Sequence, residues 1–303
     1  MTRPRLWVIG HLTIDDVVLR DGTTFMGNAA GASVYAALGA RIVGSPAAVV
    51  SRRGTGIPDE SLERLSALGI VTELEEADTP AIQQWALYED NGARTYVLHP
   101  ESGSHEDMSP RLDVSTLPPD GAVHIAPMPV HVQGEWCLAL SRESRPTTLD
   151  PHDDSCAAAP DRVLALLPHL GAFLPSELEA RHLVDAAPSV AVRRFCAAGA
   201  AIAVVKLGEQ GAVVAAGDDV WHVPALPVRP VDVTGAGDAF CGAFAATLAA
   251  GADAVTAATW ATAAASSVVE AIGTMVSPDV FDAGYIEARV RQIRPELLSG
   301  VPS

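Results

Sequence analysis

A short glycine-rich turn places the strongest constraint on what this chain can fold into. The segment Asp232–Asp238 reads Asp-Val-Thr-Gly-Ala-Gly-Asp, and a run rich in alanine and phenylalanine follows it. Glycine allows backbone N–H groups to approach an anion closely. The run 236–250 predicts a helix, and free N–H groups and the dipole at a helix N-terminus favour negative charge. The turn therefore predicts a phosphate site, with Asp238 in the first helical turn as a general base or, alternatively, as an ordinary capping aspartate.

Other phosphate-binding patterns do not match this turn. A dinucleotide fingerprint requires a third glycine, and Phe240 stands at that place. A Walker A loop requires Gly-Lys-Ser/Thr, but the one lysine of the chain, Lys206, lies between Val205 and Leu207. The His-Arg-Asp loop of protein kinases does not occur. The turn therefore predicts an anion site of another class.

Composition limits the partners of the chain. Its 303 residues are 49% hydrophobic and 19% charged, which suffices for one large α/β core. The net charge of −17 disfavours nucleic acid and anionic membranes as partners. Apolar runs are too short for a membrane span or a signal peptide, and the four cysteines are scattered without metal-ligand spacing. We therefore expect a cytoplasmic protein with free thiols.

Short apolar segments alternate with helix-like segments along the chain. This alternation predicts β-α-β units, a parallel sheet and a single α/β domain over residues 1–303. The predicted strands are 6–10, 47–51, 123–126, 147–150, 172–174, 202–207, 212–216 and 220–223, and the predicted helices are 31–43, 59–68, 177–184, 236–250 and 253–271.

A second, smaller group of strands is predicted near the start of the chain. Residues 82–88 and 94–98 flank Asp90-Asn91-Gly92-Ala93, which is a strong hairpin signal. Together with the segment after Asp15, they predict a small sheet that stands off the main one as a lid. Its expected extent is approximately 12–30 and 72–99.

The glycine-rich turn resembles the second signature of the ribokinase/PfkB carbohydrate kinase family. The segment Ala30–Gly44 is similar to the first glycine motif of that family, and the likeness covers most of the chain in the same order. The resemblance implies an α/β fold, a ribokinase-like three-layer α/β/α sandwich with a mostly parallel central sheet and a small β lid. It also implies ATP and Mg²⁺ as cofactors, and a K⁺ site is a weaker implication.

The resemblance assigns a substrate site to four residues. Asp15, in Gly10-x-x-x-x-Asp15, matches an aspartate that binds substrate hydroxyls, and Asp16 is the alternative. Gly31 lets the start of a helix approach the substrate, or serves ordinary helix packing. Tyr35 stands where relatives that phosphorylate ribose-like sugars often have Asn. Arg94 is either a lid residue that closes over the substrate or an exposed strand arginine.

Nucleotide and metal residues follow from three further segments. Pro175–Glu179 resembles an Asn-x-x-Glu motif with Ser176 in the Asn place, which implies that Glu179 organises Mg²⁺ through water, although Ser176 and Glu179 also form a capping-box pattern. The other implied residues are Lys206, Gly208 and Gly211 along the nucleotide, Thr262 near adenine, and Asp232 near a monovalent cation; a glycine-punctuated hairpin is the alternative for 206–211.

Other positions depart from the family pattern. Asp150-Pro151-His152-Asp153-Asp154 resembles a strand-end Asp-x-Asn-x-Arg segment, but His152 and Asp154 occupy the Asn and Arg places. Ribokinase specificity therefore does not transfer simply. Four histidines without metal-ligand spacing are interpreted as structural: His99, His105, His124 and His131.

The predicted function is ATP-dependent phosphorylation of an alcohol on a small polyhydroxy substrate. Asp238 is the expected base, and the backbone N–H groups of Gly235, Ala236 and Gly237 form the anion hole. A nucleoside or cyclitol kinase and a catalytically weak metabolite sensor are the alternatives. The expected partners are a small molecule and a second copy through the lid, with no nucleic acid and no membrane.

Overall fold

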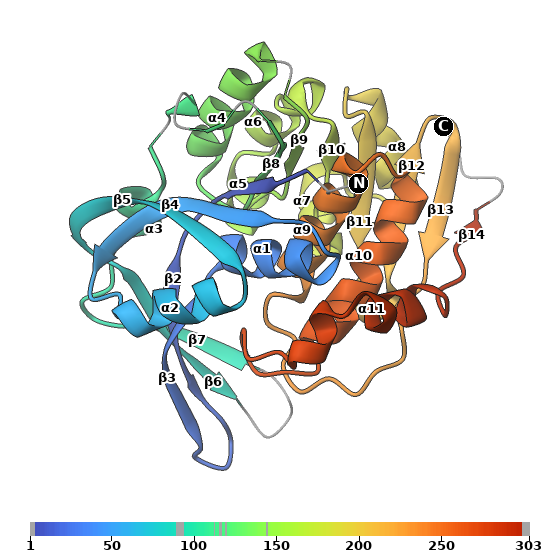
Figure 1. Ribbon diagram of the computed structural model, residues 1–303. Coiled ribbons are helices and arrows are strands. Elements are labelled where there is room, and N and C mark those ends of the chain that lie inside the picture. The colour runs from blue at the N-terminus through green and yellow to red at the C-terminus, as the bar shows by residue number, and fades with distance from the viewer. Residues whose placement is uncertain are drawn as a thin grey trace.

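A long, mostly parallel sheet forms the body of the protein (Figure 1). The computed structural model describes residues 4–88, 94–111, 113–114, 117–118, 120–143 and 145–298, and within these ranges the sheet has ten strands in the order β14-β13-β12-β11-β10-β9-β8-β1-β4-β5. Neighbours from β5 to β11 are parallel, whereas β12, β13 and β14 are antiparallel at one edge. The strands are β1 (Leu6–Ile9), β4 (Ala47–Thr55), β5 (Ile70–Pro80), β8 (Ala122–Ile125), β9 (Thr147–Leu149), β10 (Ala172–Phe173), β11 (Ile202–Lys206), β12 (Ala212–Ala216), β13 (Asp219–Val223) and β14 (Glu296–Leu297).

Helices cover both faces of this sheet (Figure 1). Successive side chains of a strand point to opposite faces. In β1, Leu6 and Val8 accordingly pack into one apolar cluster, and Trp7 and Ile9 pack into the other. The first cluster includes α1 (Ala32–Ile42), α2 (Asp59–Ala67), α9 (Ala236–Ala249), α10 (Ala254–Val268) and α11 (Ala283–Val290). The second includes α4 (Val130–Arg142), α5 (Asp153–Ala158), α6 (Pro160–Leu164), α7 (Glu177–Val184) and α8 (Pro188–Ala197), which completes the expected three-layer sandwich.

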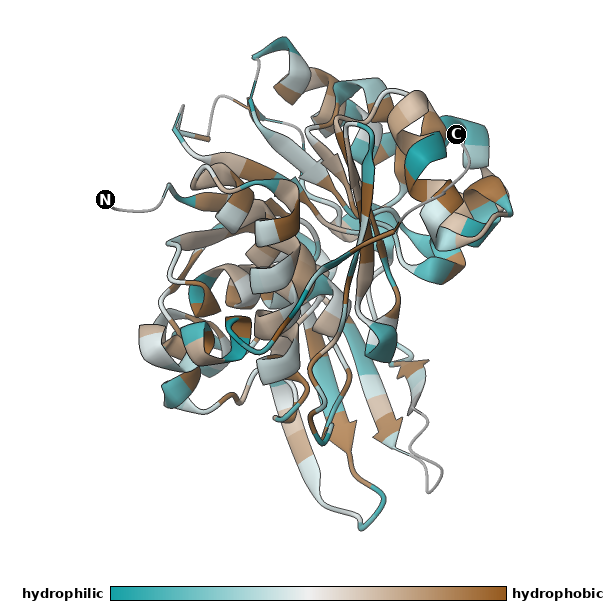
Figure 2. Cartoon of the chain, turned by 90° about the vertical axis from the view of Figure 1, so that its right-hand side faces the viewer, coloured by the Kyte–Doolittle hydropathy of each residue, from teal (hydrophilic) through white to brown (hydrophobic). Residues whose placement is uncertain are grey.

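Four strands form a separate lid sheet that extends from one edge of the body (Figures 1 and 2). In the order β3-β2-β6-β7, they are β2 (Thr13–Val18), β3 (Thr24–Ala30), β6 (Ile82–Tyr88) and β7 (Arg94–Leu98). The predicted lid range 72–99 is wrong at its start. Residues 70–80 form β5, which pairs in parallel with β4 from Ala47↔Ile70 to Thr55↔Pro80 and so belongs to the main sheet. The predicted hairpin turn at 90–93 lies outside the described residues.

The lid exposes apolar side chains. Met26, Tyr96, Val97 and Leu98 are all well exposed on its strands. The expected homodimer through the lid stays a prediction, and it would cover these side chains. Within the described ranges, no helix combines the length and the apolarity needed to cross a bilayer. All four cysteines are free thiols.

Two glycines allow helices α1 and α9 to pack backbone against backbone. A Cβ atom at Gly39 of α1 would collide with the carbonyl oxygen of Ala239, and one at Gly242 of α9 would collide with the carbonyl oxygen of Ala36. No larger residue fits at either position without moving a helix. The N-termini of both helices, at Gly31 and Gly235, line the same cavity, so this contact fixes their spacing.

Replacement of Gly242 by alanine is expected to destabilise the protein. Overpacking a close helix contact costs roughly 1–3 kcal/mol or more, although alanine has the better helix propensity. We therefore expect Gly242→Ala to lower the free energy of unfolding by about 2 kcal/mol in urea denaturation. The matched control is Gly134→Ala in α4, where the nearest atom to the new Cβ is Leu166 Cδ2 at 3.5 Å. That control should be neutral or stabilising, and equal effects of the two changes would contradict the packing argument.

Candidate functional site

A cavity of about 300 Å³ opens between the lid and the body. It lies where the loop from β1 to β2 meets the N-termini of α1 and α9, with lid strands β6 and β7 on the other side. The carboxyl end of β9 also contributes. The residues that line it are His11, Thr13, Asp15, Gly31, Ala32, Tyr35, Gln84, Tyr96, His105, Pro127, His152, Thr234, Gly235 and Asp238.

The glycine-rich turn forms the cavity wall at the start of α9. Gly235 has φ 70° and is the N-cap residue of the helix. A Cβ atom at Gly235 would overlap the Tyr35 ring, so glycine is required by contact as well as by backbone conformation. Asp232 holds the turn, because Oδ1 accepts the backbone N–H of Thr234 at 2.7 Å and Oδ2 accepts that of Gly273 at 2.8 Å. These bonds give Asp232 a positioning role in the turn, and its predicted cation role stays a prediction.

Asp238 lies in the first turn of α9 and reaches the cavity. Burial raises the pKa of its carboxyl group, and the nearby carboxylate of Glu179 raises it further. The ammonium group of Lys206 opposes both effects by favouring the ionised form. Asp238 is therefore a more basic carboxylate than an exposed aspartate, which suits proton abstraction from an alcohol.

Asp15 is buried on lid strand β2 and also faces the cavity. Its Oδ1 atom accepts hydrogen bonds from Thr13 Oγ1 and from Gln84 Nε2, both at 3.1 Å. The neighbouring Asp16 is not part of the cavity lining. Its Oδ2 atom accepts a hydrogen bond from Gln83 Nε2 at 2.9 Å. A shift of register between Asp15 and Val17 interrupts the pairing of β2 with β3. The structure thus places Asp15 rather than Asp16 in the cavity.

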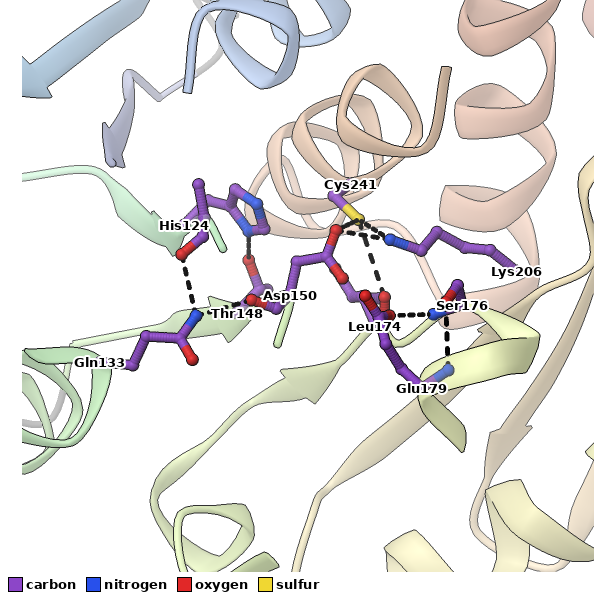
Figure 3. Close-up of polar contacts among 10 residues, drawn as sticks. His124, Gln133, Thr148, Asp150, Leu174, Ser176, Glu179, Lys206 and Cys241 are labelled. Atoms are coloured by element: carbon purple, nitrogen blue, oxygen red, sulfur yellow. Dashed lines mark hydrogen bonds and ion pairs between the residues drawn. The ribbon is translucent and has the colours of Figure 1, made fainter. Parts of the chain in front are cut away.

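A buried polar cluster links the ends of β9 and β11 to α9 (Figure 3). Lys206, at the end of β11, has its Nζ atom 2.5 Å from Asp150 Oδ2 and 3.3 Å from Cys241 Sγ. Burial alone would lower the pKa of Lys206, but the carboxylates of Asp150 and Glu179 hold it well above its usual value. Lys206 therefore stays cationic, and its partner in the structure is Asp150.

Glu179 forms a capping box with Ser176, which was the alternative interpretation of this sequence pattern. Its Oε2 atom accepts the backbone N–H of Ser176 at 2.6 Å, and Ser176 Oγ accepts the backbone N–H of Glu179 at 3.3 Å (Figure 3). The side chain is only half-buried. Among the described residues, no group of three or more His, Cys, Asp or Glu side chains could hold a metal ion alone. One accessible carboxylate fits Mg²⁺ that is held mainly by phosphates and water.

Other predicted residues lie outside the cavity lining. Gly208 has φ 58° with open space around it, whereas a Cβ atom at Gly211 would collide with the Val223 carbonyl oxygen. Thr262 is buried in α10, where its hydroxyl has no partner among the described residues. Arg94 begins β7, but its side chain lies outside the described part of the structure. The nucleotide roles of the first three and the substrate role of Arg94 stay predictions.

Sequence reasoning missed a cluster of histidines in the cavity. The rings of His11 and His105 are 5.1 Å apart, and those of His105 and His152 are 6.0 Å apart. Burial, and then the neighbouring His105, lower the pKa of His11 to about 4, and burial also lowers that of His105. His105, interpreted as structural from the sequence, thus lines the cavity. His11 lies in the pattern Gly10-x-x-x-x-Asp15 and His152 departs from a family pattern, and these were the available signals.

Three lid residues opposite the glycine-rich turn were not predicted either, and no sequence signal pointed to them. Gln84 reaches Asp15 from β6, and the hydroxyl groups of Tyr88 and Tyr96 lie 3.4 and 3.5 Å from Thr234 Oγ1. These contacts depend on how β6 pairs with β2 and how β7 pairs with β6, which no local pattern specifies. Lid strands β6 and β7 therefore contact both Asp15 and the glycine-rich turn.

Curated relatives of the chain include two kinases. The chain is 29% identical over 248 residues to a cytidine kinase from Thermococcus kodakarensis, which covers 79% of this chain and 86% of that protein. It is also 29% identical over 290 residues to a ribokinase from Bacillus subtilis, which covers 88% of this chain and 93% of that protein.

Solved structures of the same fold include sugar and nucleoside kinases. A putative ribokinase II from E. coli superposes with a TM-score of 0.79 at 21% identity, covering 96% of this chain and 100% of that one. A nucleoside kinase from Burkholderia thailandensis, solved with inosine, gives a TM-score of 0.77 at 18% identity and covers 95% and 96%. At these identities the likeness establishes the ribokinase fold. The family model of the pfkB carbohydrate kinases matches residues 5–280, nearly the whole chain, and the protein therefore belongs to the pfkB family of carbohydrate kinases.

Proposed function

We propose that the protein is an ATP-dependent kinase that phosphorylates an alcohol group of a small, uncharged polyhydroxy acceptor. One observation carries the proposal: Asp238, the Gly235 turn and Asp15 line the same cavity. A base, an anion-binding helix start and a hydroxyl-binding carboxylate are the parts that phosphoryl transfer to an alcohol requires. A sensor without catalysis would not need a basic carboxylate beside an anion site.

The chemistry assigned to these residues is a direct displacement. Asp15, oriented by Thr13 and Gln84, accepts hydrogen bonds from acceptor hydroxyls. Asp238 takes the proton of the attacking hydroxyl while the acceptor oxygen bonds to the γ-phosphorus of ATP. The bond from that phosphorus to the bridging oxygen breaks, and its electron pair leaves with ADP. N–H groups of the Gly235–Gly237 turn stabilise the charge on the phosphoryl oxygens.

Mg²⁺ fits this scheme as a companion of the nucleotide. When bound, it supplies positive charge to the phosphates. Glu179 would hold it through water, because one of its oxygens already accepts the Ser176 N–H. Among the solved neighbours, a putative ribokinase II from E. coli was determined with ATP and Mg²⁺.

A nucleoside is a second candidate acceptor. Aromatic rings make up a large part of the cavity wall: His11, Tyr35, Tyr96, His105 and His152. Flat π-systems favour stacking against a planar base. The relatives point the same way, since they include a cytidine kinase and a nucleoside kinase solved with inosine.

Removal of the proposed base tests the central assignment. Asp238→Asn should lower kcat for ADP release roughly 100- to 10,000-fold, because general-base catalysis contributes about that much. The thermal midpoint should stay the same or rise, since a buried ionisable group becomes neutral. Asp218→Asn, in the exposed turn between β12 and β13, is the matched control and should leave both quantities unchanged. Unchanged turnover in Asp238→Asn would remove Asp238 from the mechanism.

We also expect the enzyme to prefer an uncharged acceptor. Two carboxylates, Asp15 and Asp238, share the cavity, and its described lining includes no arginine or lysine. We expect kcat/KM for ribose and for cytidine to exceed that for their 5′-phosphates by roughly 100-fold, because like charges in close contact cost several kcal/mol. Coupled ADP-release assays at pH 8 measure the ratio. A preference for the phosphorylated compounds would show that a cationic side chain outside this lining binds the phosphate of the acceptor.

His152 distinguishes the two acceptor classes. Its Nδ1 atom accepts the backbone N–H of Asp154 at 3.2 Å, so the neutral ring carries its proton on Nε2 and can donate to a base. If the acceptor is a nucleoside, His152→Ala should raise KM for cytidine about fivefold, the cost of one hydrogen bond, and leave KM for ribose unchanged. His131→Ala, on α4 outside the cavity lining, is the control. Equal effects on cytidine and ribose would argue against base recognition at His152.

A further inference from the structure

One member of the histidine cluster, His11, is held firmly in the cavity wall. It follows β1 and lines the cavity, although the residue as a whole is only 4% exposed. Its backbone carbonyl accepts a hydrogen bond from Ser33 Oγ of α1 at 2.6 Å. The next backbone N–H, that of Leu12, donates to Ser51 Oγ of β4 at 2.9 Å. A residue fixed in this way presents its ring atoms at defined points.

The Nε2 atom of the His11 ring is bound to the segment 105–109, which contains α3 (His105–Met108). It lies 2.9 Å from the backbone carbonyl oxygen of His105 and 3.0 Å from Ser109 Oγ. The Ser109 hydroxyl donates its hydrogen to the same carbonyl oxygen, at 2.7 Å. Because a carbonyl oxygen only accepts, the neutral His11 ring carries its hydrogen on Nε2. The hydrogen-bond network thus assigns the tautomer and leaves Nδ1 with a free lone pair.

The other ring nitrogen of His11, Nδ1, has no hydrogen-bond partner in the part of the chain that the structure describes. Burial and the neighbouring His105 lower the pKa of His11 to about 4, so the ring is neutral at pH 7 and Nδ1 can accept. A polar atom in a cavity wall finds its partner in water or in the bound molecule. A molecule that displaces this water must supply a donor of its own, or the hydrogen bond is lost.

We propose that His11 is a specificity-determining residue, whose Nδ1 atom accepts a hydrogen bond from an N–H or O–H group of the alcohol substrate. This inference rests on the proposed kinase function and adds to it a group that the substrate must carry. In that function the reacting alcohol lies at Asp238 and a further hydroxyl at Asp15. The group that meets His11 is therefore a third point of recognition on the same molecule. A molecule without a donor there binds more weakly.

His152 provides the complementary donor. Its Nδ1 atom accepts the backbone N–H of Asp154, so its Nε2 atom carries the hydrogen. The rings of His11 and His152 both pack near His105, at centroid distances of 5.1 and 6.0 Å. The cavity wall thus presents a hydrogen-bond acceptor on one ring and a donor on another. The amino group and ring nitrogen of cytosine match this pair, and two sugar hydroxyl groups offer the same chemistry.

Two variants of His11 separate substrate recognition from the contact with α3. In His11→Gln the side-chain amide reaches the place of Nε2 and still donates to the His105 carbonyl, but carbon replaces Nδ1. In His11→Asn the shorter amide reaches the place of Nδ1 and loses the contact with His105. The two variants therefore each keep one half of what the imidazole ring does.

We expect the two variants to differ in opposite directions. His11→Gln should keep the wild-type thermal midpoint and raise KM for the alcohol about fivefold, with kcat and KM for ATP unchanged, because one uniform binding contact is lost. His11→Asn should lower the midpoint and leave KM for the alcohol nearer to the wild-type value. The reverse pattern would overturn the proposal, because it would show that the ring only holds the segment 105–109.

Three substrates identify the group that donates to His11: cytidine, its analogue without the 4-amino group (2-pyrimidinone riboside), and ribose. If the base amino group donates, the wild type should prefer cytidine over the analogue about fivefold, and His11→Gln should not distinguish them. If a sugar hydroxyl donates, His11→Gln should raise KM for all three compounds by the same factor. Either result supports the proposal, and KM values unchanged for all three compounds would overturn it.

Nuclear magnetic resonance reads the tautomer directly. In protein labelled with ¹⁵N-histidine, the His11 signals are those that disappear in His11→Gln. We expect an unprotonated Nδ1 and a protonated Nε2 at pH 7, as the contacts with His105 and Ser109 require. A hydrogen on Nδ1 would overturn the proposal, because this atom could then only donate.

Calorimetry without ATP tests the contact apart from turnover. We expect Kd for cytidine or for ribose to be about fivefold higher in His11→Gln than in the wild type. Identical behaviour of the two proteins toward both compounds would overturn the inference. If no alcohol yields ADP with the wild-type protein, the kinase proposal fails by itself, and these Kd values still decide whether His11 contacts the bound molecule.

Discussion

The close contact between helices α1 and α9 is the constraint on which the candidate site depends. Gly39 and Gly242 let the two backbones meet where any side chain would collide. Each helix contributes its N-terminus to the cavity, α1 through Gly31 and α9 through Gly235. In a packed core, helices cannot shift by fractions of an ångström without cost. In the proposed function, this contact in the apolar layer that covers the sheet sets the spacing between the acceptor and the phosphoryl group.

A buried lysine lies beside a helix N-terminus in this acidic chain. The protein carries a net charge of −17, which repels nucleotides in general. At the carboxyl ends of β9 and β11, Asp150 and Lys206 form a buried pair next to the N-terminus of α9. A helix start and a buried ammonium thus lie close together in an otherwise acidic chain. In the proposed function, a nucleotide is received by the glycine-rich turn rather than by the surface as a whole.

The sequence predicted those structural features that depend only on residues close together in the chain. The turn before α9, the capping box at Ser176 and the hairpin strands 82–88 and 94–98 all follow from local patterns, and the structure contains each of them. The partner of a strand is not a local property. Residues 72–80 therefore entered the predicted lid although they pair with β4. The histidine cluster and the ion pair of Lys206 were missed for the same reason, since sheet order alone brings their elements together.

Thr234 contacts both the lid and Asp232 of the glycine-rich turn. Asp232 accepts both the backbone N–H and the hydroxyl of Thr234, so the residue is fixed relative to the anion turn. The same hydroxyl lies within 3.5 Å of the Tyr88 and Tyr96 hydroxyl groups of the lid. Lid position and turn geometry thus share one residue. A lid displaced from the body would lose these contacts and open the space around Asp238 to water. In the proposed function, an acceptor bound at Asp15, which lies on lid strand β2, would also help to keep water away from the phosphoryl group.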